Sequence, residues 1–345
     1  MKCQVVHPDA SLVSTTNAVL LTIAGAVILI SNLIANGLLL YSMKKLRFLS
    51  PVSYKFILSL VICDICVALL SQPTTIAAMY MPHDDEIKVT SSSCMTRLFS
   101  EFFAFLLCEC SGVLVMNITL DRYLHMKYLQ NYNTKMTPYR ANVLIVSAWV
   151  FSAIVAVIFV LASLYGFIFI YHTVILLVDL PIISANFFLY SRAFFTLRKR
   201  VNEMNLNATS RSSDRADLLF AKAVALILIV IIVCYSPYFA IQTAWLYISY
   251  MKNETPSPAL SVASYWAILF IHSSSLCNPI ILIFSNAESK TFIKDLCNRC
   301  TSVFCHRETP NEEVAKPSDY GSTVTISSVV LSRKFDHEES SQSSL

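Results

Sequence analysis

Long apolar runs separated by short polar segments fill most of the chain. A helix needs about 20 mainly apolar residues to cross a bilayer, and each run is long enough. The pattern predicts membrane-spanning helices at residues 18–43, 54–80, 97–124, 141–164, 167–192, 218–250 and 261–285. Residues 142–189 contain almost no polar break, so we expect two helices there, joined by a tight turn at Tyr165 and Gly166, where glycine can take a positive φ.

The composition agrees with this pattern. Of the 345 residues, 55% are hydrophobic and only 14% are charged, which excludes an ordinary soluble domain. Residues 1–16 lack a basic segment followed by a cleavable apolar core, so we expect the first span to direct membrane insertion. The predicted fold class is an all-α membrane protein, a seven-transmembrane helix bundle followed by a short amphipathic eighth helix.

The basic residues cluster in alternate loops, and this asymmetry sets the predicted orientation. One set of loops is flanked by or contains many lysines and arginines: Lys44, Lys45, Arg47, Lys55, Lys127, Lys135, Arg140, Arg192, Arg198, Lys199, Arg200, Arg211, Arg215 and Lys222. The opposite loops hold only Lys88, Arg97, Lys252 and the amino-terminal Lys2. By the positive-inside rule, the amino terminus is extracellular and the carboxyl terminus cytoplasmic, which requires an odd number of spans.

The predicted spans and their orientation divide the chain into four regions. They are a short extracellular amino terminus (1–17), the membrane domain (18–285), an amphipathic helix on the inner surface (286–300) and a disordered cytoplasmic tail (301–345). Phe292, Ile293 and Leu296 lie at helical spacing and predict the amphipathic helix. Three cysteines near its end could be palmitoylated: Cys297, Cys300 and Cys305.

The serine-rich tail could recruit two further partners. Phosphorylation within residues 322–328 would create a negatively charged docking strip for arrestin. The terminal Ser343, Ser344 and Leu345 fit a PDZ ligand that would add as a strand. The alternative for both segments is a plain solvated linker.

Several ionisable residues lie inside the apolar runs, where a charged side chain is costly unless it is paired or hydrated. Asp121 and Arg122 end the third span; the alternative to a functional site is an interfacial arginine that snorkels to water. Glu109 and Asp179 lie deeper, and they invite a cationic group or a coupled proton. Their alternative is a protonated, hydrogen-bonded side chain packed between helices.

At these positions the chain resembles the rhodopsin-like (class A) G-protein-coupled receptors. The resemblance covers about residues 18–300, and the matching positions occur in order along the helices: Asn36, Leu60, Asp64, Asp121, Arg122, Tyr123, Trp149, Pro181, Cys234, Pro237, Asn278 and Pro279. It implies a plasma-membrane receptor, not an enzyme, that passes an extracellular ligand signal to heterotrimeric G proteins by outward movement of the sixth helix. Membrane lipids are further partners, and nucleic acid is not expected.

The resemblance also assigns roles on the cytoplasmic side. Asp121, Arg122 and Tyr123 would form the G-protein switch, with Asp217 as the acidic half of an inactive-state latch; the alternative for Asp217 is an acid favoured by a helix N-terminus. The remaining residues of this coupling set are Tyr235, Pro237, Asn278 and Pro279. Both prolines should kink their helices.

Two departures from the family pattern affect this switch. Tyr235 stands where the family usually has tryptophan, and Leu282 replaces the tyrosine expected three residues after Pro279. Leucine has no hydroxyl with which to stabilise the active state.

The same resemblance implies a sodium ion held by Asp64, Ser111, Ser275 and Asn278, with no covalent cofactor. Oxygen ligands suit a small hard cation, and an ion would offset the cost of burying the carboxylate. The alternative is a hydrogen-bonded, protonated Asp64 with waters and no ion.

The ligand class is narrowed mainly by exclusion within the family. His272 occupies the place of the lysine that holds retinal in opsins, and Ala104 occupies the place of the aspartate that amine receptors use. The predicted ligand pocket is mostly aromatic and consists of Glu101, Ala104, Phe105, Cys108, Tyr238, Phe239, Gln242, Trp266 and His272. An interfacial acid is the alternative for Glu101.

The predicted second outer loop is nearly absent and has no cysteine, so it cannot carry the family's usual disulfide. The melanocortin receptors share this short loop, and with the lysophospholipid, cannabinoid and adenosine receptors they form a group to which the chain is weakly similar. Only Cys3 and Cys94 fall in segments placed outside the cell, so the topology allows one disulfide between them.

Two other functions remain open at this point. One is an atypical receptor that acts through arrestin or as a scavenger, and the missing tyrosine at Leu282 favours it. The other is a secondary transporter, against which stand the odd number of spans and the lack of internal repeats.

Overall fold

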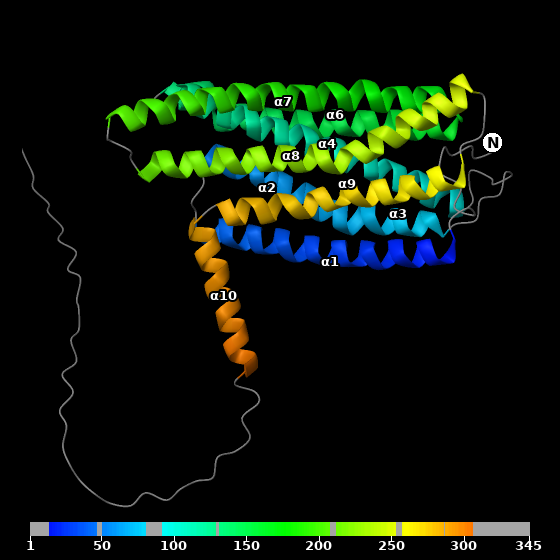
Figure 1. The fold of residues 1–345 in the computed structure, drawn as a ribbon, viewed down its shortest axis with the longest axis horizontal. Coiled ribbons are helices and arrows are strands. Elements are labelled where there is room, and N and C mark those ends of the chain that lie inside the picture. The colour runs from blue at the N-terminus through cyan, green and yellow to red at the C-terminus, as the bar shows by residue number, and fades with distance from the viewer. Residues whose placement is uncertain are drawn as a thin grey trace, which may run out of the picture. The chain divides into compact units, whose positions relative to one another are not determined.

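The computed structural model describes residues 14–46, 50–80, 92–128, 131–207, 212–252, 257–285 and 287–305 (Figure 1). By its internal contacts the chain separates into residues 1–299 and 300–345. The first unit carries all the membrane helices, and every site discussed below lies within it.

Seven helices in the described part of the chain are long and apolar enough to cross a membrane, and this confirms the predicted fold class. They run from Thr15–Leu46 (α1), Pro51–Met79 (α2, a π-helical turn and α3), Ser92–Tyr128 (α4), Pro138–Leu164 (α6), Ile168–Asn207 (α7), Ser212–Leu246 (α8) and Pro258–Ser285 (α9). The shorter elements are the helix α5 (Tyr132–Lys135), a π-helical turn after α8 (Tyr247–Met251) and α10 (Ala287–Cys305). No strand occurs among the described residues.

Local sequence signals explain where the helices begin. Pro51 and Pro138 occupy first-turn positions, where the missing N–H of proline costs nothing. The preceding Ser50 accepts a hydrogen bond from the backbone N–H of Ser53, and Thr137 accepts one from the N–H of Arg140. Each N-cap therefore satisfies a donor that the helix itself leaves open.

The tight turn between α6 and α7 is confirmed. Gly166 has φ 71°, the left-handed conformation that favours glycine. The N–H of Phe167 donates to the carbonyl of Ala162 (2.8 Å), and the N–H of Gly166 donates to that of Ser163 (3.1 Å). This paired arrangement is a Schellman motif, which ends α6 and lets α7 start within a few residues.

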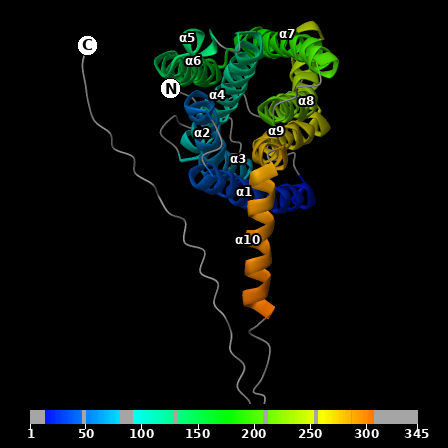
Figure 2. The same ribbon diagram turned by 90° about the vertical axis from the view of Figure 1, so that its left-hand side faces the viewer.

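α4 is the central helix of the bundle. It contacts α2, α3, α5, α6, α7 and α8, and in the view along the bundle it lies among them (Figure 2). Of its most apolar stretch 61% is buried, against 17% for α7. Polar residues of α4 therefore face the bundle interior, whereas large apolar side chains of α7 face the surrounding lipid.

α10 directly follows the last span, as the amphipathic pattern predicts, and it extends to Cys305 rather than ending near residue 300. Phe292 packs against Tyr41 of α1, with ring centroids 5.4 Å apart, and the Lys45 ammonium lies 5.6 Å from the Phe292 ring centre. The side chains of the candidate palmitoylation cysteines Cys297, Cys300 and Cys305 lie outside the described part of the chain.

Candidate functional site

Two other elements, α2 and α5, contact the charged pair of Asp121 and Arg122 near the end of α4. Arg122 donates to Oδ2 of Asp121 from Nη2 (2.6 Å) and from Nε (3.1 Å). Ser53 of α2 donates to the same Oδ2 (3.0 Å) and accepts from Arg122, while the Tyr132 hydroxyl of α5 donates to Oδ1. The Asp121 carboxylate thus accepts hydrogen bonds from three residues, and these side chains offset the cost of burying it.

Ser53 and Tyr132 are residues that the sequence patterns missed. Ser53 could be mistaken for a member of the helix cap, and Tyr132 for part of a polar loop. Burial and then the neighbouring Asp121 carboxylate raise the pKa of Tyr132, so its hydroxyl remains a hydrogen-bond donor at neutral pH.

Of the predicted switch residues nearest this pair, Tyr123 is described by the structure and the side chain of Asp217 is not. Tyr123 packs against Met126 and Ala193 rather than joining the pair, and the Lys127 ammonium lies 5.4 Å from its ring centre. Asp217 belongs to α8, but its side chain lies outside the described part of the chain. Its role as a latch stays a prediction.

A second polar cluster surrounds Asp64 in the middle of the bundle. Nδ2 of Asn278 donates to Oδ2 of Asp64 (3.0 Å), and Nδ2 of Asn32 donates to the Asp64 backbone carbonyl (3.2 Å). Asn36 donates to the backbone carbonyl of Ser275 (3.3 Å). These bonds join α1, α2 and α9, and they add Asn32 to the residues predicted from sequence.

Acceptor oxygens in this cluster fit a small cation. Among the described residues, Oδ1 of Asp64, Oδ1 of Asn278 and Oδ1 of Asn36 have no hydrogen-bond partner, although all three residues are buried. Ser111 is buried, and so is Ser275, whose side chain lies near the Asp64 carboxyl. Buried oxygens left without donors are the groups that sodium would coordinate.

A cavity lies on the opposite side of this cluster from Arg122 and encloses about 600 Å³ free of protein atoms, part of it open to the surroundings. Six of the nine predicted ligand residues line it: Glu101, Ala104, Phe105, Cys108, Tyr238 and His272. The cavity is also lined by residues that the sequence patterns did not include in the predicted pocket: Thr75, Ser100, Glu109, Tyr171, Asp179, Tyr235, Ile268 and Ile271.

The three remaining predicted ligand residues are placed differently. Gln242 is buried and hydrogen-bonds Nδ1 of His172 through its side-chain oxygen (2.6 Å). Trp266 packs with a small apolar cluster that joins α1, α3 and α9, and Phe239 packs against the aromatic cluster around Phe105. Side-chain direction on the helix, which spacing alone left open, separates these residues from the cavity wall.

Three carboxyl residues line the cavity, and these are Glu101, Glu109 and Asp179. Glu101 lies nearest the start of α4. It is 3% exposed, with Arg97 one turn earlier on the same helix and the Ser163 side chain nearby. His272, across the cavity, shares a hydrogen bond with the Ser71 hydroxyl (3.0 Å). A ligand with a basic group would find a carboxyl in a mostly apolar and aromatic surrounding.

The sequence profile of the family described as "7 transmembrane receptor (rhodopsin family)" matches residues 35–282, well over half of the chain. The chain belongs to this family. It is therefore a multi-pass membrane receptor of the G-protein-coupled class, with an extracellular ligand and heterotrimeric G proteins as partners, and not an enzyme.

Curated relatives agree with this placement. The receptor is 27% identical to melanocortin receptor 5 from Homo sapiens, over 79% of its own length and 83% of that protein. It is 25% identical to melanocortin receptor 4 from Danio rerio, over 77% and 80% of the two chains. The weak similarity to melanocortin receptors expected from the short outer loop is confirmed.

The two departures from the family pattern have clear positions in this receptor. The Tyr235 hydroxyl donates to the backbone carbonyl of Cys108 (3.4 Å), so α8 is tied to α4 at the cavity wall, two residues before Pro237. Leu282 is buried in the main apolar cluster, three residues after Pro279. The kink residues are therefore retained, while the polar contact of the usual tyrosine is replaced by packing.

The structure describes the oxidation state of seven cysteines. Cys94 is disulfide-bonded, whereas Cys63, Cys66, Cys108, Cys110, Cys234 and Cys277 are free thiols. The predicted partner, Cys3, lies outside the described residues, so the pairing stays a prediction.

Proposed function

We propose that a ligand with a basic group enters the cavity from the extracellular side, pairs with Glu101 and shifts the receptor to a state in which α8 moves outward at Pro237. Movement of α8 would withdraw Asp217, the predicted latch residue, from Arg122 and open a cytoplasmic cleft for the G protein. The observation that carries this proposal is the buried Asp121–Arg122 pair, closed by Ser53 and Tyr132 at the end of the bundle opposite the cavity.

The orientation belongs to the same proposal. The amino terminus would be extracellular and the carboxyl terminus cytoplasmic, because lysine and arginine gather in the loops at the Arg122 end. This places the cavity on the side from which a ligand arrives.

Through Tyr235, a bound ligand could affect the position of α8. It lines the cavity, lies two residues before Pro237 and is bonded to α4. A ligand that contacts Tyr235 or Tyr238 more favourably in the outward state shifts the equilibrium by that difference in affinity, and no other driving force is required.

We also propose that sodium binds beside Asp64 and stabilises the closed state. The donor set supports this: unpaired oxygens of Asp64 and Asn278 lie between α2 and α9, so an ion would hold these helices together. Outward movement of α8 would therefore weaken the binding of sodium.

The ligand is argued from the cavity of this chain and not from the names of its relatives. Those relatives are named for melanocortin, but at about a quarter identity their ligand is only one candidate. A basic peptide or another cationic molecule fits the Glu101 carboxyl equally well.

A coupling screen across G-protein families tests the proposal. Basal or agonist-driven nucleotide exchange should be detected for at least one G protein and should be lost in Arg122→Ala at normal surface expression. Arg140→Ala is the matched control, because Arg140 is exposed and donates only to backbone carbonyls of the nearby loop. Unchanged exchange in Arg122→Ala would contradict the assigned switch.

An arrestin-coupled or scavenger receptor is the second candidate, favoured by the buried Leu282. Arrestin recruitment without nucleotide exchange in the same screen would select it. The phosphorylation segment at 322–328 and the terminal Ser343, Ser344 and Leu345, which would bind arrestin and a PDZ domain, lie outside the described residues.

A further inference from the structure

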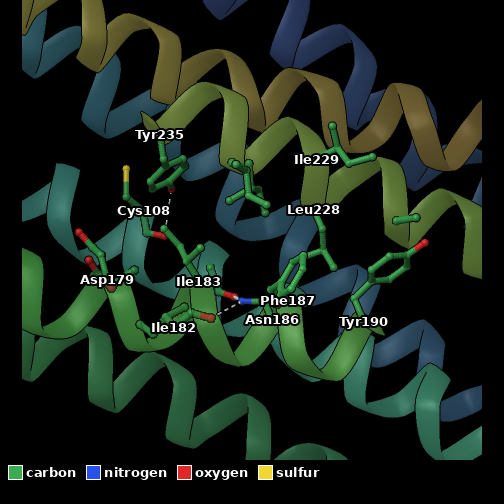
Figure 3. A pocket seen from close by; sticks show the side chains of 15 residues that line it. Cys108, Asp179, Ile182, Ile183, Asn186, Phe187, Tyr190, Leu228, Ile229 and Tyr235 are labelled. Carbon is green, nitrogen blue, oxygen red and sulfur yellow. Dashed lines mark hydrogen bonds between the residues drawn. The ribbon is translucent and has the colours of Figure 1, made fainter. Parts of the chain in front are cut away.

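A second cavity opens between α7 and α8 and reaches α4. It encloses about 920 Å³ free of protein atoms, part of it open to the surroundings. Figure 3 shows the α7 residues Asp179, Asn186 and Tyr190 along one side, with Leu228, Ile229 and Tyr235 of α8 across from them. We name this cavity the α7–α8 crevice.

The mouth of the α7–α8 crevice faces the hydrocarbon of the bilayer. Phe187, Ile229 and Ile232 line it and are 63%, 55% and 42% exposed, and all three lie within helices long and apolar enough to cross the membrane. Because these side chains lie at bilayer depth, the molecule that reaches them is a lipid-soluble one.

Two carboxyl groups lie at the inner end of this apolar crevice. Glu109 of α4 and Asp179 of α7 are 5% and 8% exposed, both line the crevice, and each lies within reach of the other's charge. Two carboxylates this close cannot both stay ionised, so the pair shares a proton and carries at most one negative charge. One ammonium group would neutralise it.

Asn186 provides an independent sign of a ligand. Its Nδ2 donates to the carbonyls of Ile182 (3.0 Å) and Gly112 (3.5 Å), which settles the orientation of the amide. Its Oδ1 is buried and has no hydrogen-bond partner among the described residues, although Asn186 is 5% exposed and lines the crevice. An unpaired buried acceptor calls for a donor from an occupant.

We propose that the α7–α8 crevice binds a lipophilic primary amine, with the ammonium at Glu109 and Asp179 and the chain along the apolar walls. Asn186 follows Asp179 by seven residues, so the two lie on one helix face about 10 Å apart. A hydroxyl or amide N–H about 10 Å along the chain of the amine would satisfy Oδ1 of Asn186. The α7–α8 crevice meets the ligand cavity beside Glu101 at Cys108, Glu109, Asp179 and Tyr235, which line both, but it opens to lipid between α7 and α8. The proposed amine site goes beyond the proposed signalling function.

Photolabelling of the full-length receptor in phosphatidylcholine nanodiscs tests this site. The probes are dodecylamine and dodecanol, each carrying a diazirine at the same place in the chain, and labelled α7 and α8 peptides are identified by mass spectrometry. We expect the amine to label these peptides at least about tenfold more than the alcohol, which corresponds to one charge-assisted contact. Equal labelling by the two probes would show that any apolar chain enters, and it would overturn the proposal.

Two sets of variants locate the amine. In the double variant Glu109→Gln and Asp179→Asn, which keeps the side-chain volumes, the preference for the amine should fall to about one; a retained preference would overturn the proposal. Gly112→Leu fills the crevice and should abolish labelling with both carboxyls intact. Gly112→Ala is its control, because the added Cβ would lie 3.6 Å from Cγ2 of Ile182, an ordinary contact.

The Gly112 variants test the proposal even if the double carboxyl variant does not fold. Undiminished amine labelling of the same peptides in Gly112→Leu would place the amine elsewhere and overturn the proposal. The readout is binding at α7 and α8 rather than nucleotide exchange, so its failure leaves the proposed signalling function standing.

Discussion

Ser53 shows at the residue scale how much a buried ion pair depends on neutral side chains. It lies between Asp121 and Arg122, donating to one and accepting from the other. Burying both charges is favourable only if their remaining donors and acceptors are also satisfied. The stability of the closed switch is therefore shared with α2 and α5.

We expect Ser53→Ala and Tyr132→Phe each to raise basal nucleotide exchange, by up to about tenfold, since a hydrogen bond to a charged group contributes about 1.5–3 kcal/mol. The measurement is nucleotide exchange without agonist at matched surface expression. Ser147→Ala is the control, because Ser147 is exposed and bonds only within its own helix. Lower basal exchange in both folded variants would contradict a role in closing the switch.

Asp64 makes a second prediction at this scale. Asp64→Asn should remove any dependence of agonist affinity on sodium, because a neutral amide cannot supply the charge that holds the ion. Agonist affinity is measured in sodium chloride and in N-methyl-D-glucamine chloride at equal ionic strength. A sodium effect of unchanged size in the variant would exclude Asp64 as a ligand.

At the scale of elements, the apolar pattern predicted the start of two helices only to within three residues, because the spans expected from residues 54 and 141 begin at Pro51 and Pro138. Proline after serine or threonine starts two helices, and Gly166 ends another. These signals are local, since each depends on backbone conformation within a few residues. The rotation of each helix about its axis depends on packing against the other helices. Because of this rotation, Gln242 and Trp266 do not line the cavity.

Gly166→Ala tests the turn between α6 and α7. A side chain at φ 71° is strained, so we expect a loss of about 1–2 kcal/mol and a lower unfolding temperature in detergent. Gly37→Ala is the matched control, because no atom outside its own helix neighbourhood lies within 4 Å of the added Cβ. That variant should be neutral or slightly more stable.

At the scale of the whole molecule, Cys94 ties the start of α4 to a distant part of the chain through its disulfide. A bridge between segments far apart in sequence restricts the unfolded chain strongly. The predicted partner is Cys3, by the topology of the loops.

Cys94→Ser should lower the free energy of unfolding by about 2–4 kcal/mol and reduce surface expression. If Cys3 is the partner, Cys3→Ser and the double variant should show the same loss, measured by thermal unfolding. Cys66→Ser, at a free thiol, is the control. A normal Cys3→Ser protein would assign the bridge to another cysteine.

The sequence by itself determined the number and approximate positions of the spans, the turn at Gly166 and the family, because hydrophobic length, glycine conformation and ordered motifs are properties of the linear chain. It also placed Asp121, Arg122 and Asp64, since an ionisable residue inside an apolar run stands out without any coordinates.

Only the tertiary structure decided which side chains meet. Ser53 and Arg122 are 69 residues apart, and Asn278 and Asp64 are 214 apart. Glu109 and Asp179 come together from α4 and α7 at the inner end of a crevice that opens to lipid. Such contacts depend on the rotation and depth of each helix, which packing sets for the whole bundle at once, and no spacing along one helix encodes them.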